Sequence, residues 1–424
     1  DEFIRTTKYD SCPAFTPSRA SAVMFSPTTS ALDLGEAFEL GRLVHTPLQP
    51  GVWTFLEPMG EQNHAPHLCW IGPDLLACVW MAGGQEGTAG MSIYLSLLAK
   101  GSSSWTLPQR ISQDPGRSEQ NPLLFVAGET LHLIHSAQRV RDPDDASWQQ
   151  QADTTFSMQW TAALRQQTLP LNQLVPDQPE SWGADAWSPC RDLIENPAFC
   201  RHPPVATADG WLLPIYRSLE TGGSFGHDHS EVLPLTPKGA PADKATPIPN
   251  CTGRVHGSIV PKTDGEGWLQ FFRSRLADRI YRSSSRDGLA WTDPEPISLP
   301  NNNSSIHAQR LTSGRLALIF NRFGFEPDPS APQEWGDANW PRTRWPLSVA
   351  ISPDDGDSWP WIRDLDTGFG FCGPLNWDLN GQLAYPVLLE GRPGELHIAY
   401  SWGGRQAIRY LCIDEHEIMG VLHD

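Results

Sequence analysis

The chain has 424 residues and a formal net charge of −18, with 31 lysines and arginines against 49 aspartates and glutamates. This charge argues against nucleic acid or an anionic membrane surface as a partner, because the overall field repels phosphate. Only 19% of the residues are charged, whereas glycine (36), proline (39) and tryptophan (18) are frequent, so we expect one all-β domain of short strands joined by turns.

The first part of the chain carries little pattern. We expect residues 1–50 to form an N-terminal extension that closes or packs on the domain, and residues 51–424 to form the domain itself. The longest apolar stretch, around Leu75 to Met81, is far shorter than the roughly 20 residues that span a bilayer. We therefore expect a soluble chain with no membrane partner.

Short apolar runs separated by turns follow one another along the rest of the chain. A unit of about 40 to 50 residues that repeats several times is typical of the four-stranded blades of a β-propeller. The length predicts a single propeller of seven blades, with six as the alternative. The runs cover residues 91–95, 131–135, 210–216, 268–273, 315–320, 347–351, 382–389, 396–402 and 407–412.

Two of the turns share one sequence pattern, S-x-D-x-G-x-T/S-W. They run from Ser284 to Trp291 and from Ser352 to Trp359, and the first has Arg286 where the pattern has aspartate. In such a turn a side-chain acceptor binds backbone N–H groups, glycine adopts a positive φ, and tryptophan packs under the loop. We expect both turns to be structural.

Cysteines and N-glycosylation patterns indicate the cellular compartment of the protein. The eight cysteines include no C-x-x-C pair, which favours disulfides over a zinc ribbon. N-glycosylation patterns begin at Asn250, Asn302 and Asn303. We expect a secreted, extracellular protein, and since no signal peptide is visible, export implies that one has been removed.

The two turns resemble the Asp boxes of the sialidase (neuraminidase) superfamily, and the second half of the chain resembles its BNR-repeat branch. The resemblance covers about residues 60 to 412 and implies a sialidase-like propeller. It rests on residues 255–260, 271–275, 278–283, 299–304, 310–316 and 347–352, and more loosely on residues 63–66, 118–122 and 210–214.

Sialidases of this superfamily bind the substrate carboxylate with three arginines and use a tyrosine nucleophile paired with a glutamate. An aspartate serves as acid and base. At the positions that resemble those of the family, His64 stands for the first arginine and His256 for the glutamate. Glu86 is the only carboxylate near the position of the aspartate, and Tyr385 matches the nucleophile. The resemblance offers Arg273 or Arg279 as the second arginine and Arg342 or Arg344 as the third.

A site with arginines, histidines and a tyrosine but few carboxylates suits β-elimination beside a uronic acid. Arginines stabilise the charge that develops on the uronate, while histidine or tyrosine moves the proton. We therefore predict a polysaccharide lyase with His64, His256 and Tyr385 as catalytic residues. By resemblance to propeller lyases, its linkage is rhamnosyl-glucuronate in arabinogalactan or gum arabic. An exo-acting sialidase-like hydrolase that uses Tyr385 and Glu86, and a glycan-binding lectin without turnover, are the alternatives.

Further residues are candidates for binding the acidic oligosaccharide or polysaccharide. They are Arg201, Arg217, Asn121, Asn303 and His307. The structural interpretation of the two arginines is a loop salt bridge, and that of Asn303 and His307 is a glycosylated rim.

A metal site is a separate possibility. Residues 227–231 offer three ligand types, of which His227, Asp228 and His229 are the candidate ligands, although alternation along a strand also places the two histidines on one face without a metal. Calcium could neutralise the substrate carboxylate. We expect no organic cofactor and a monomeric protein.

Overall fold

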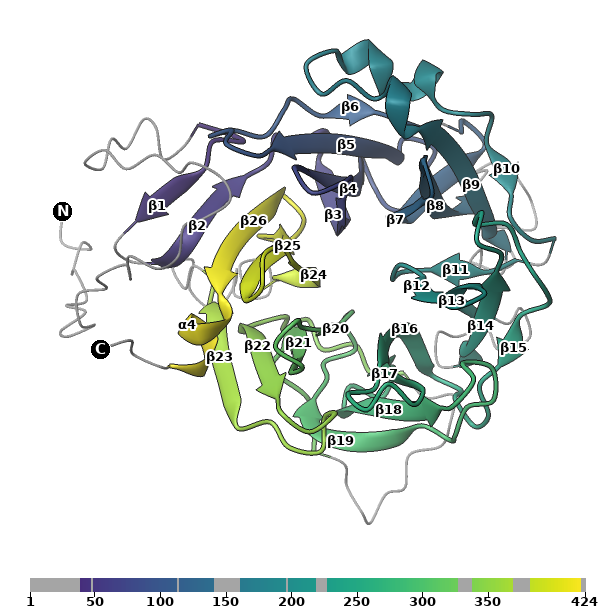
Figure 1. Ribbon diagram of the computed structural model, residues 1–424, viewed down its shortest axis with the longest axis vertical. Coiled ribbons are helices and arrows are strands. Elements are labelled where there is room, and N and C mark those ends of the chain that lie inside the picture. The colour runs from purple at the N-terminus through teal and green to yellow at the C-terminus, as the bar shows by residue number, and fades with distance from the viewer. Residues whose placement is uncertain are drawn as a thin grey trace.

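Six antiparallel sheets surround a central axis in the computed structural model, which describes residues 39–46, 49–112, 114–140, 161–195, 197–218, 227–326, 338–368 and 382–420 (Figure 1). Blades one and two contain β3 (Gln62–Trp70), β4 (Leu75–Gly83), β5 (Ser92–Ala99) and β6 (Gln109–Arg110), then β7 (Arg117–Ala127), β8 (Thr130–Arg139), β9 (Ala163–Pro170) and β10 (Arg191–Asp192). Blade three contains β11 (Phe199–Cys200), β12 (Val205–Thr207), β13 (Gly210–Arg217), β14 (His229–Leu235) and β15 (Thr246–Pro247).

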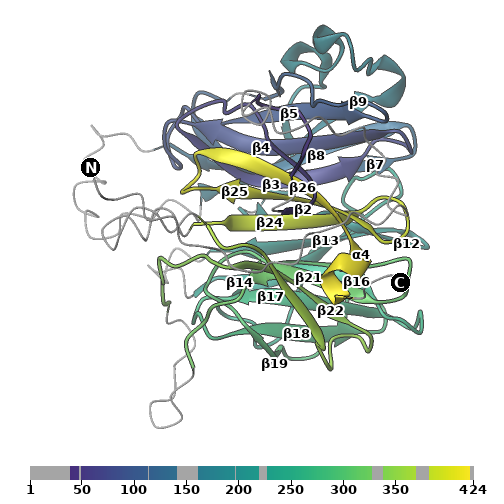
Figure 2. The same cartoon turned by 90° about the vertical axis from the view of Figure 1, so that its left-hand side faces the viewer.

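The second half of the chain forms antiparallel blades of the same kind. Blade four contains β16 (Arg254–Pro261), β17 (Trp268–Ser274), β18 (Arg279–Ser285) and β19 (Glu295–Pro300). Blade five contains β20 (His307–Arg310), β21 (Leu316–Asn321), β22 (Leu347–Ser352) and β23 (Trp361–Asp366). The blades stand side by side around the ring when it is seen from the edge (Figure 2).

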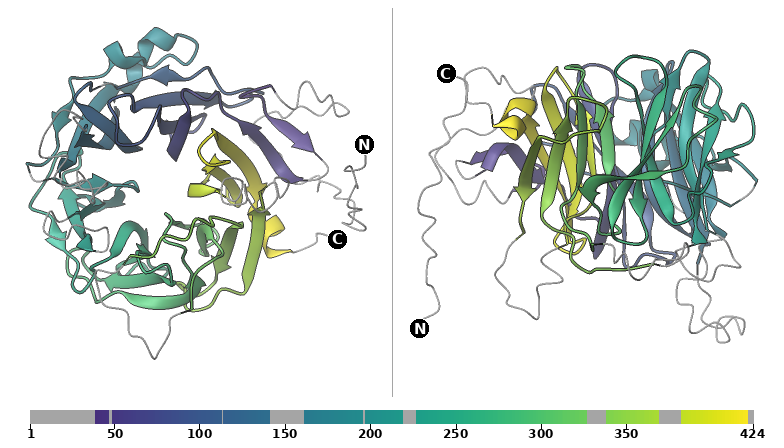
Figure 3. Two further views of the ribbon diagram at one scale, coloured as in Figure 1. Left: turned by 180° about the vertical axis from the view of Figure 1, so that it is seen from behind. Right: turned by 90° about the horizontal axis from the view of Figure 1, so that it is seen from below.

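Blade six joins the two ends of the described chain. It runs from β24 (Ala384–Glu390) through β25 (Glu395–Trp402) and β26 (Ala407–Asp414) to β2 (Gln49–Phe55) and β1 (Val44–Thr46). The N-terminal strands therefore close the ring from outside, next to the C-terminal strands (Figure 3). The predicted boundary at residue 51 falls inside β2, and residues 1–38 lie outside the described residues.

The all-β propeller is confirmed, and it has six blades, the alternative count, instead of seven. The expected repeat of about 40 to 50 residues per blade was too short, because long connections between strands lengthen some blades. Blade two alone runs from Arg117 to Asp192 and includes three short helices, η2 (Leu171–Gln173), η3 (Pro179–Ser181) and η4 (Ala184–Ala186). A short helix, α4 (Glu415–Met419), follows β26. No helix in the described part of the chain is long and apolar enough to cross a membrane.

The core consists of separate apolar layers between neighbouring blades. Six of the buried clusters each combine residues of two adjacent blades, and together they complete the ring. Middle strands such as β4 are buried along nearly their whole length, because both faces of each blade pack against a neighbour. The hydrophobic contribution to stability is thus spread around the ring.

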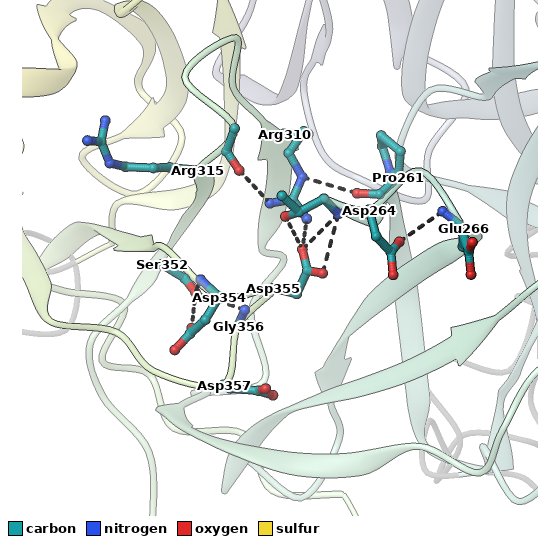
Figure 4. Close-up of polar contacts among 12 residues, drawn as sticks. Pro261, Asp264, Glu266, Arg310, Arg315, Ser352, Asp354, Asp355, Gly356 and Asp357 are labelled. Atoms are coloured by element: carbon teal, nitrogen blue, oxygen red, sulfur yellow. Dashed lines mark hydrogen bonds and ion pairs between the residues drawn. The ribbon is translucent and has the colours of Figure 1, made fainter.

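Both Asp-box turns form. In the second, Ser352 Oγ accepts a hydrogen bond from Gly356 N–H at 2.8 Å (Figure 4). Asp354 Oδ1 accepts one from Ser358 N–H at 2.8 Å. In the first, Ser285 Oγ accepts from Gly288 N–H at 2.8 Å, and the carboxylate is that of Asp287. The acceptors of the first box are therefore Ser285 and Asp287, one residue later than the sequence pattern predicts.

The second Asp box also ties two blades together. The carboxylate of Asp355 accepts hydrogen bonds from Arg310 and, at 2.7 Å, from Thr263 Oγ1 in the loop between β16 and β17 (Figure 4). Burial opposes ionisation, but Thr263 and Arg310 outweigh it and lower the pKa of Asp355. The turn of blade five is thereby fixed to blade four.

The predicted disulfides do not form among the described cysteines. Cys69, Cys78, Cys200, Cys251 and Cys412 are buried free thiols and Cys190 is an exposed one, whereas Cys12 and Cys372 lie outside the described residues. The buried thiols pack as small apolar groups between blades: Cys69, Cys200 and Cys251 lie in three different layers, whereas Cys78 and Cys412 share a fourth.

The glycosylation patterns differ in accessibility. Asn302 and Asn303 are each 1% exposed, so neither can carry a glycan in the folded chain. Asn250 is exposed.

Candidate active site

Bulges near the start of four inner strands direct side chains away from the sheets. The register shifts between His64 and His67 in β3, between Gln120 and Leu123 in β7, between Val255 and Ser258 in β16, and between Ala384 and Val387 in β24. A bulge leaves a residue out of the ladder and changes the direction of its side chain.

Each bulge contains a non-glycine residue with positive φ. These residues are Ala65 (53°), Asn121 (50°), His256 (55°) and Tyr385 (52°). Such a backbone conformation costs on the order of 1–3 kcal/mol and is concentrated at functional sites. In β3, β7 and β24 a proline follows, and proline cannot donate to the ladder.

Tyr385 lies at the centre of the cluster of polar side chains. Its hydroxyl accepts a hydrogen bond from Arg273 Nη1 at 2.8 Å. Its ring centroid lies 4.2 Å from that of His64 and 5.4 Å from that of His256. The guanidinium carbon of Arg344 lies 5.7 Å from the centre of the Tyr385 ring. The structure thus brings together all three predicted catalytic residues and three of the predicted arginines, Arg273, Arg344 and Arg201, whose guanidinium carbon lies 5.2 Å from the ring centre.

The arginines change the acidity of the tyrosine. Burial raises the pKa of Tyr385, but the charges of Arg273 and Arg344 outweigh it, and the net effect lowers the pKa below its usual value. Among the described tyrosines whose pKa shifts, Tyr385 is the only one shifted downward. Its phenol is therefore the one best prepared to lose a proton.

The two histidines are held neutral. Burial, followed by the charges of nearby arginines, lowers the pKa of both His64 and His256 well below the usual value. His64 Nδ1 shares a hydrogen bond of 2.8 Å with Ser401 Oγ. Neither His64 Nε2 nor His256 Nδ1 has a hydrogen-bond partner among the described residues. Each therefore has a ring nitrogen available for a proton or a ligand.

Glu86 supplies a carboxylate at the edge of the site, in the connection between β4 and β5. Its Oε2 accepts a hydrogen bond from Arg405 Nη1 at 2.6 Å, and Arg405 Nη1 also donates to Gln62 Oε1 at 3.1 Å. The charge of Glu86 raises the pKa of Tyr385, so the two groups interact electrostatically. The carboxylate is thus oriented by an arginine that the sequence did not single out.

Arg273 keeps one donor unused. Its Nε donates to Asn303 Oδ1 at 2.8 Å and its Nη1 to Tyr385, whereas its Nη2 is buried without a partner among the described residues. A buried guanidinium N–H without an acceptor is costly, so an anionic ligand beside Arg273 would satisfy it. Asn303, a predicted binding residue, instead holds this arginine in place.

Arg201 fixes the backbone at Pro66 and Tyr385. Its guanidinium donates to the carbonyl oxygen of Pro66 at 3.2 Å and to that of Tyr385 at 2.9 Å, so it links the bulges of β3 and β24. These hydrogen bonds hold the backbone of the site in place.

Other predicted binding residues are occupied elsewhere. Arg217 pairs with Glu231 at 2.8 Å, and Arg279 pairs with Glu326 at 2.5 Å. His307 Nδ1 accepts from the backbone N–H of Leu388 at 3.1 Å and so connects blades five and six.

Two more predicted residues have backbone roles. The carbonyl oxygen of Asn121 accepts from the Cys200 thiol at 3.4 Å. The carbonyl oxygen of Arg342 accepts from Gln382 Nε2 at 3.4 Å.

The predicted metal ligands are engaged separately. Asp228 accepts from Arg275 Nε at 3.1 Å, and His229 Nε2 lies 3.0 Å from Glu231 Oε1. His227 precedes them in the same stretch. In the described parts of the chain, the only group of three possible metal ligands close together is Glu395, His397 and Cys412.

That group is already bonded internally. His397 Nε2 lies 3.0 Å from Glu395 Oε1, and Arg392 donates to Glu395 Oε2 at 2.6 Å. A metal ion there would have to displace these contacts.

Three contributors were missed by sequence reasoning. Tyr216, at the end of a predicted strand, has its ring 5.1 Å from that of His256, and burial raises its pKa well above the usual value. Arg405 and Ser401 belong to blade six and reach blade one only after the ring has closed. For these two no local pattern gives a signal, whereas a proline directly after the residue with positive φ marks three of the four bulges.

The sequence matches the family described as BNR repeat-like domain over residues 74–398. A comparison with curated proteins gives no match.

Solved structures with the same fold include a Hadza microbial sialidase, with a TM-score of 0.61, 12% identity, and coverage of 84% of this chain and 66% of that one. A protein of unknown function from Dyadobacter fermentans has a TM-score of 0.61, 16% identity, and coverage of 85% and 97%. For a Penicillium chrysogenum alpha-L-arabinanase the TM-score is 0.52, at 9% identity and coverage of 84% and 94%. The chain spans about two thirds of the Hadza sialidase, and at these identities the likeness concerns the fold alone.

Proposed function

Because the chain belongs to the BNR repeat-like domain family, we propose that it is an exo-acting glycoside hydrolase for glycans that end in a carboxylate-bearing sugar. The observation that carries the proposal is the hydrogen bond of 2.8 Å from Arg273 to the hydroxyl of Tyr385, whose pKa is lowered. An activated tyrosine beside cationic side chains suits nucleophilic attack on a sugar that carries negative charge. The sialidases and the arabinanase that share the fold support a glycan as the substrate.

The proposed roles follow from the contacts. Arg344 and the unused Nη2 of Arg273 bind the substrate carboxylate. The Tyr385 oxygen attacks the anomeric carbon, and its proton passes to His256, which is neutral. Glu86 gives a proton to the departing glycosidic oxygen. In the second step Glu86 takes a proton from water, the water oxygen displaces the tyrosine, and the Tyr385 oxygen takes its proton back from His256, so the anomeric configuration is retained.

A lyase is the second candidate, favoured by a specific observation. No carboxylate within the described ranges is hydrogen-bonded to the Tyr385 hydroxyl, and two neutral histidines flank its ring. In that reaction a base removes the C5 proton of a uronate, the C4–O bond breaks, a C4=C5 double bond forms, and the leaving oxygen is protonated. The rhamnosyl-glucuronate linkage of arabinogalactan or gum arabic is the proposed target of this alternative.

The products distinguish the candidates. The purified protein is incubated separately with 3′-sialyllactose, gum arabic and ulvan, and both reducing sugar and near-ultraviolet absorbance are followed. Hydrolysis releases reducing sugar without new absorbance, whereas elimination produces an absorbing unsaturated uronate. Binding of a glycan without either product identifies a lectin and contradicts both enzymatic candidates.

The substitution Tyr385→Phe tests the nucleophile. We expect it to lower turnover by at least about a hundredfold, because the phenol oxygen that reacts is removed. Mass spectrometry after incubation with a fluorinated glycoside should find a covalent sugar on the peptide that contains Tyr385. Tyr94→Phe, on β5 outside the site, is the matched control and should retain full activity. Unchanged turnover in Tyr385→Phe contradicts the proposal.

Calcium binding, secretion and a monomeric state remain proposals. The six described cysteines form no disulfide. The proposal of secretion therefore rests on the proposed glycans, which are extracellular. Activity measured with added EDTA and then with added calcium tests whether the arginines alone suffice to bind the carboxylate.

A further inference from the structure

One short turn beside the candidate active site supports two loops. Residues 275–277 follow β17, and their carbonyl oxygens accept hydrogen bonds from Asn339 N–H at 2.8 Å, from Asn339 Nδ2 at 2.9 Å and from Phe325 N–H at 2.6 Å. The backbone on either side of these contacts is therefore fixed against blade four. Trp340 follows Asn339 directly.

Trp340 is unusual among the large apolar side chains, most of which are buried. It is 45% exposed, although its backbone neighbour is held by several hydrogen bonds. The guanidinium carbon of Arg273 lies 5.4 Å from the centre of its ring, and that of Arg275 lies 5.3 Å away. Cation–π attraction to these arginines orients the indole, while nearly half of its surface stays accessible.

The same contacts connect the indole to Tyr385. Arg273 donates to the Tyr385 hydroxyl and also lies against the Trp340 ring. Asn303 accepts from Arg273 Nε at 2.8 Å, and its Nδ2 donates to the Asn339 carbonyl oxygen at 2.7 Å. One asparagine thus fixes both the arginine of the site and the segment that carries the indole.

We infer that Trp340 forms a binding subsite for a second sugar of the substrate, on which the apolar C–H face of that sugar stacks. This inference rests on the proposed function, because the acidic terminal sugar would occupy Arg273 and Arg344. An exposed aromatic face joined to a few oriented polar groups is the usual composition of a carbohydrate site. The preferred substrate is then an oligosaccharide, and a simple glycoside of the terminal sugar fills only part of the site.

The experiment compares matched pairs of ligands. One pair is 3′-sialyllactose and methyl α-sialoside, and the other is a disaccharide with terminal glucuronic acid and methyl glucuronide. Binding is measured by calorimetry in the Tyr385→Phe background, so that turnover does not interfere. Trp340→Ala and Trp340→Phe are compared with Leu107→Ala, which removes an apolar side chain that is 73% exposed on the distant blade one.

We expect Trp340→Ala to weaken oligosaccharide binding roughly three- to tenfold, as the loss of one stacked ring does, and to change methyl glycoside binding less than about twofold. Trp340→Phe should restore most of the loss, and Leu107→Ala should have no effect. Equal weakening of both ligands of a pair contradicts the subsite, because the indole would then act only through Arg273. No weakening of either ligand also contradicts it. Failure of the protein with an intact Trp340 to bind any of the four ligands overturns the proposed function itself.

Discussion

Neutral histidines and charged arginines together surround Tyr385 and set its chemistry. The ring neighbours His64 and His256 both have a pKa well below the usual value, so the positive charge near the phenol comes from arginines alone. In the proposed function, those arginines stabilise the phenolate and also bind the anionic substrate. One charge cluster would then serve both binding and activation.

This double role predicts a shift in the ionisation of Tyr385 when the charge of Arg273 is removed. Arg273 lowers the pKa of the phenol, so Arg273→Gln should raise it and move the pH at which the phenolate forms to higher values. Arg273→Lys keeps the charge and should leave that pH closer to that of the unsubstituted protein. The measurement is an ultraviolet titration of tyrosinate, taken as the difference from the same protein carrying Tyr385→Phe. A titration unchanged in Arg273→Gln would show that the arginine does not control the phenol.

Resemblance to related proteins singles out three residues that the structure brings together. His64, His256 and Tyr385 meet around one ring although they come from three different blades. Ser401 and Arg405 could not be found in this way, since their contacts to blade one cross more than 300 residues of chain and exist only after ring closure. Arg217 and Arg279 were plausible by residue type but are paired with nearby carboxylates.

Among the elements, β2 has the largest consequence for the ring. It joins the N-terminal part of the chain to β26, with Val52 opposite Cys412, and so completes blade six. The strand runs were predictable from their apolar residues and turns, whereas the assignment of β1 and β2 to the last blade depends on pairing across the whole chain.

Docking of β2 requires Gly51 to have no side chain. Its φ is 74°, and a Cβ there would lie 1.9 Å from the carbonyl oxygen of Cys412. Gly72 has the same φ, but a Cβ there meets no atom within 4 Å. Both glycine-to-alanine substitutions carry the cost of a positive φ, so their difference isolates the clash.

We expect Gly51→Ala to lower the free energy of unfolding by about 1–3 kcal/mol more than Gly72→Ala, because the added methyl group overpacks the contact between β2 and β26. Urea denaturation of the two variants, followed by tryptophan fluorescence, measures this difference. Equal destabilisation would mean that β2 does not contribute to closing the ring.

At the scale of the whole molecule, stability is distributed over six layers between blades, and polar contacts at the inner strands join the layers. His67 Nδ1 accepts from Leu124 N–H at 3.2 Å between blades one and two, and His307 makes the corresponding contact between blades five and six. A ring nitrogen that accepts a backbone N–H cannot also carry a proton. The fold therefore depends on these histidines being neutral.

Seven buried histidines have a lowered pKa, and together they predict a steep loss of stability in acid. The pKa is lowered to about 3 for His307 and to about 4 for His132, and it is lowered as well for His64, His67, His202, His256 and His397. Below pH of about 6.5 only the unfolded chain takes up these protons, so the stabilisation is complete above that pH and is lost as the pH falls.

Each such proton costs about 1.4 kcal/mol per pH unit, and seven cost up to about 10 kcal/mol per pH unit. Against a total stability of roughly 5–15 kcal/mol, unfolding should occur within about two pH units below 6.5. Urea titrations at successive pH values measure the slope directly. His307→Gln should reduce that slope by about one proton in seven. A free energy of unfolding that stays constant between pH 6.5 and pH 5 would contradict a ring that depends on neutral histidines.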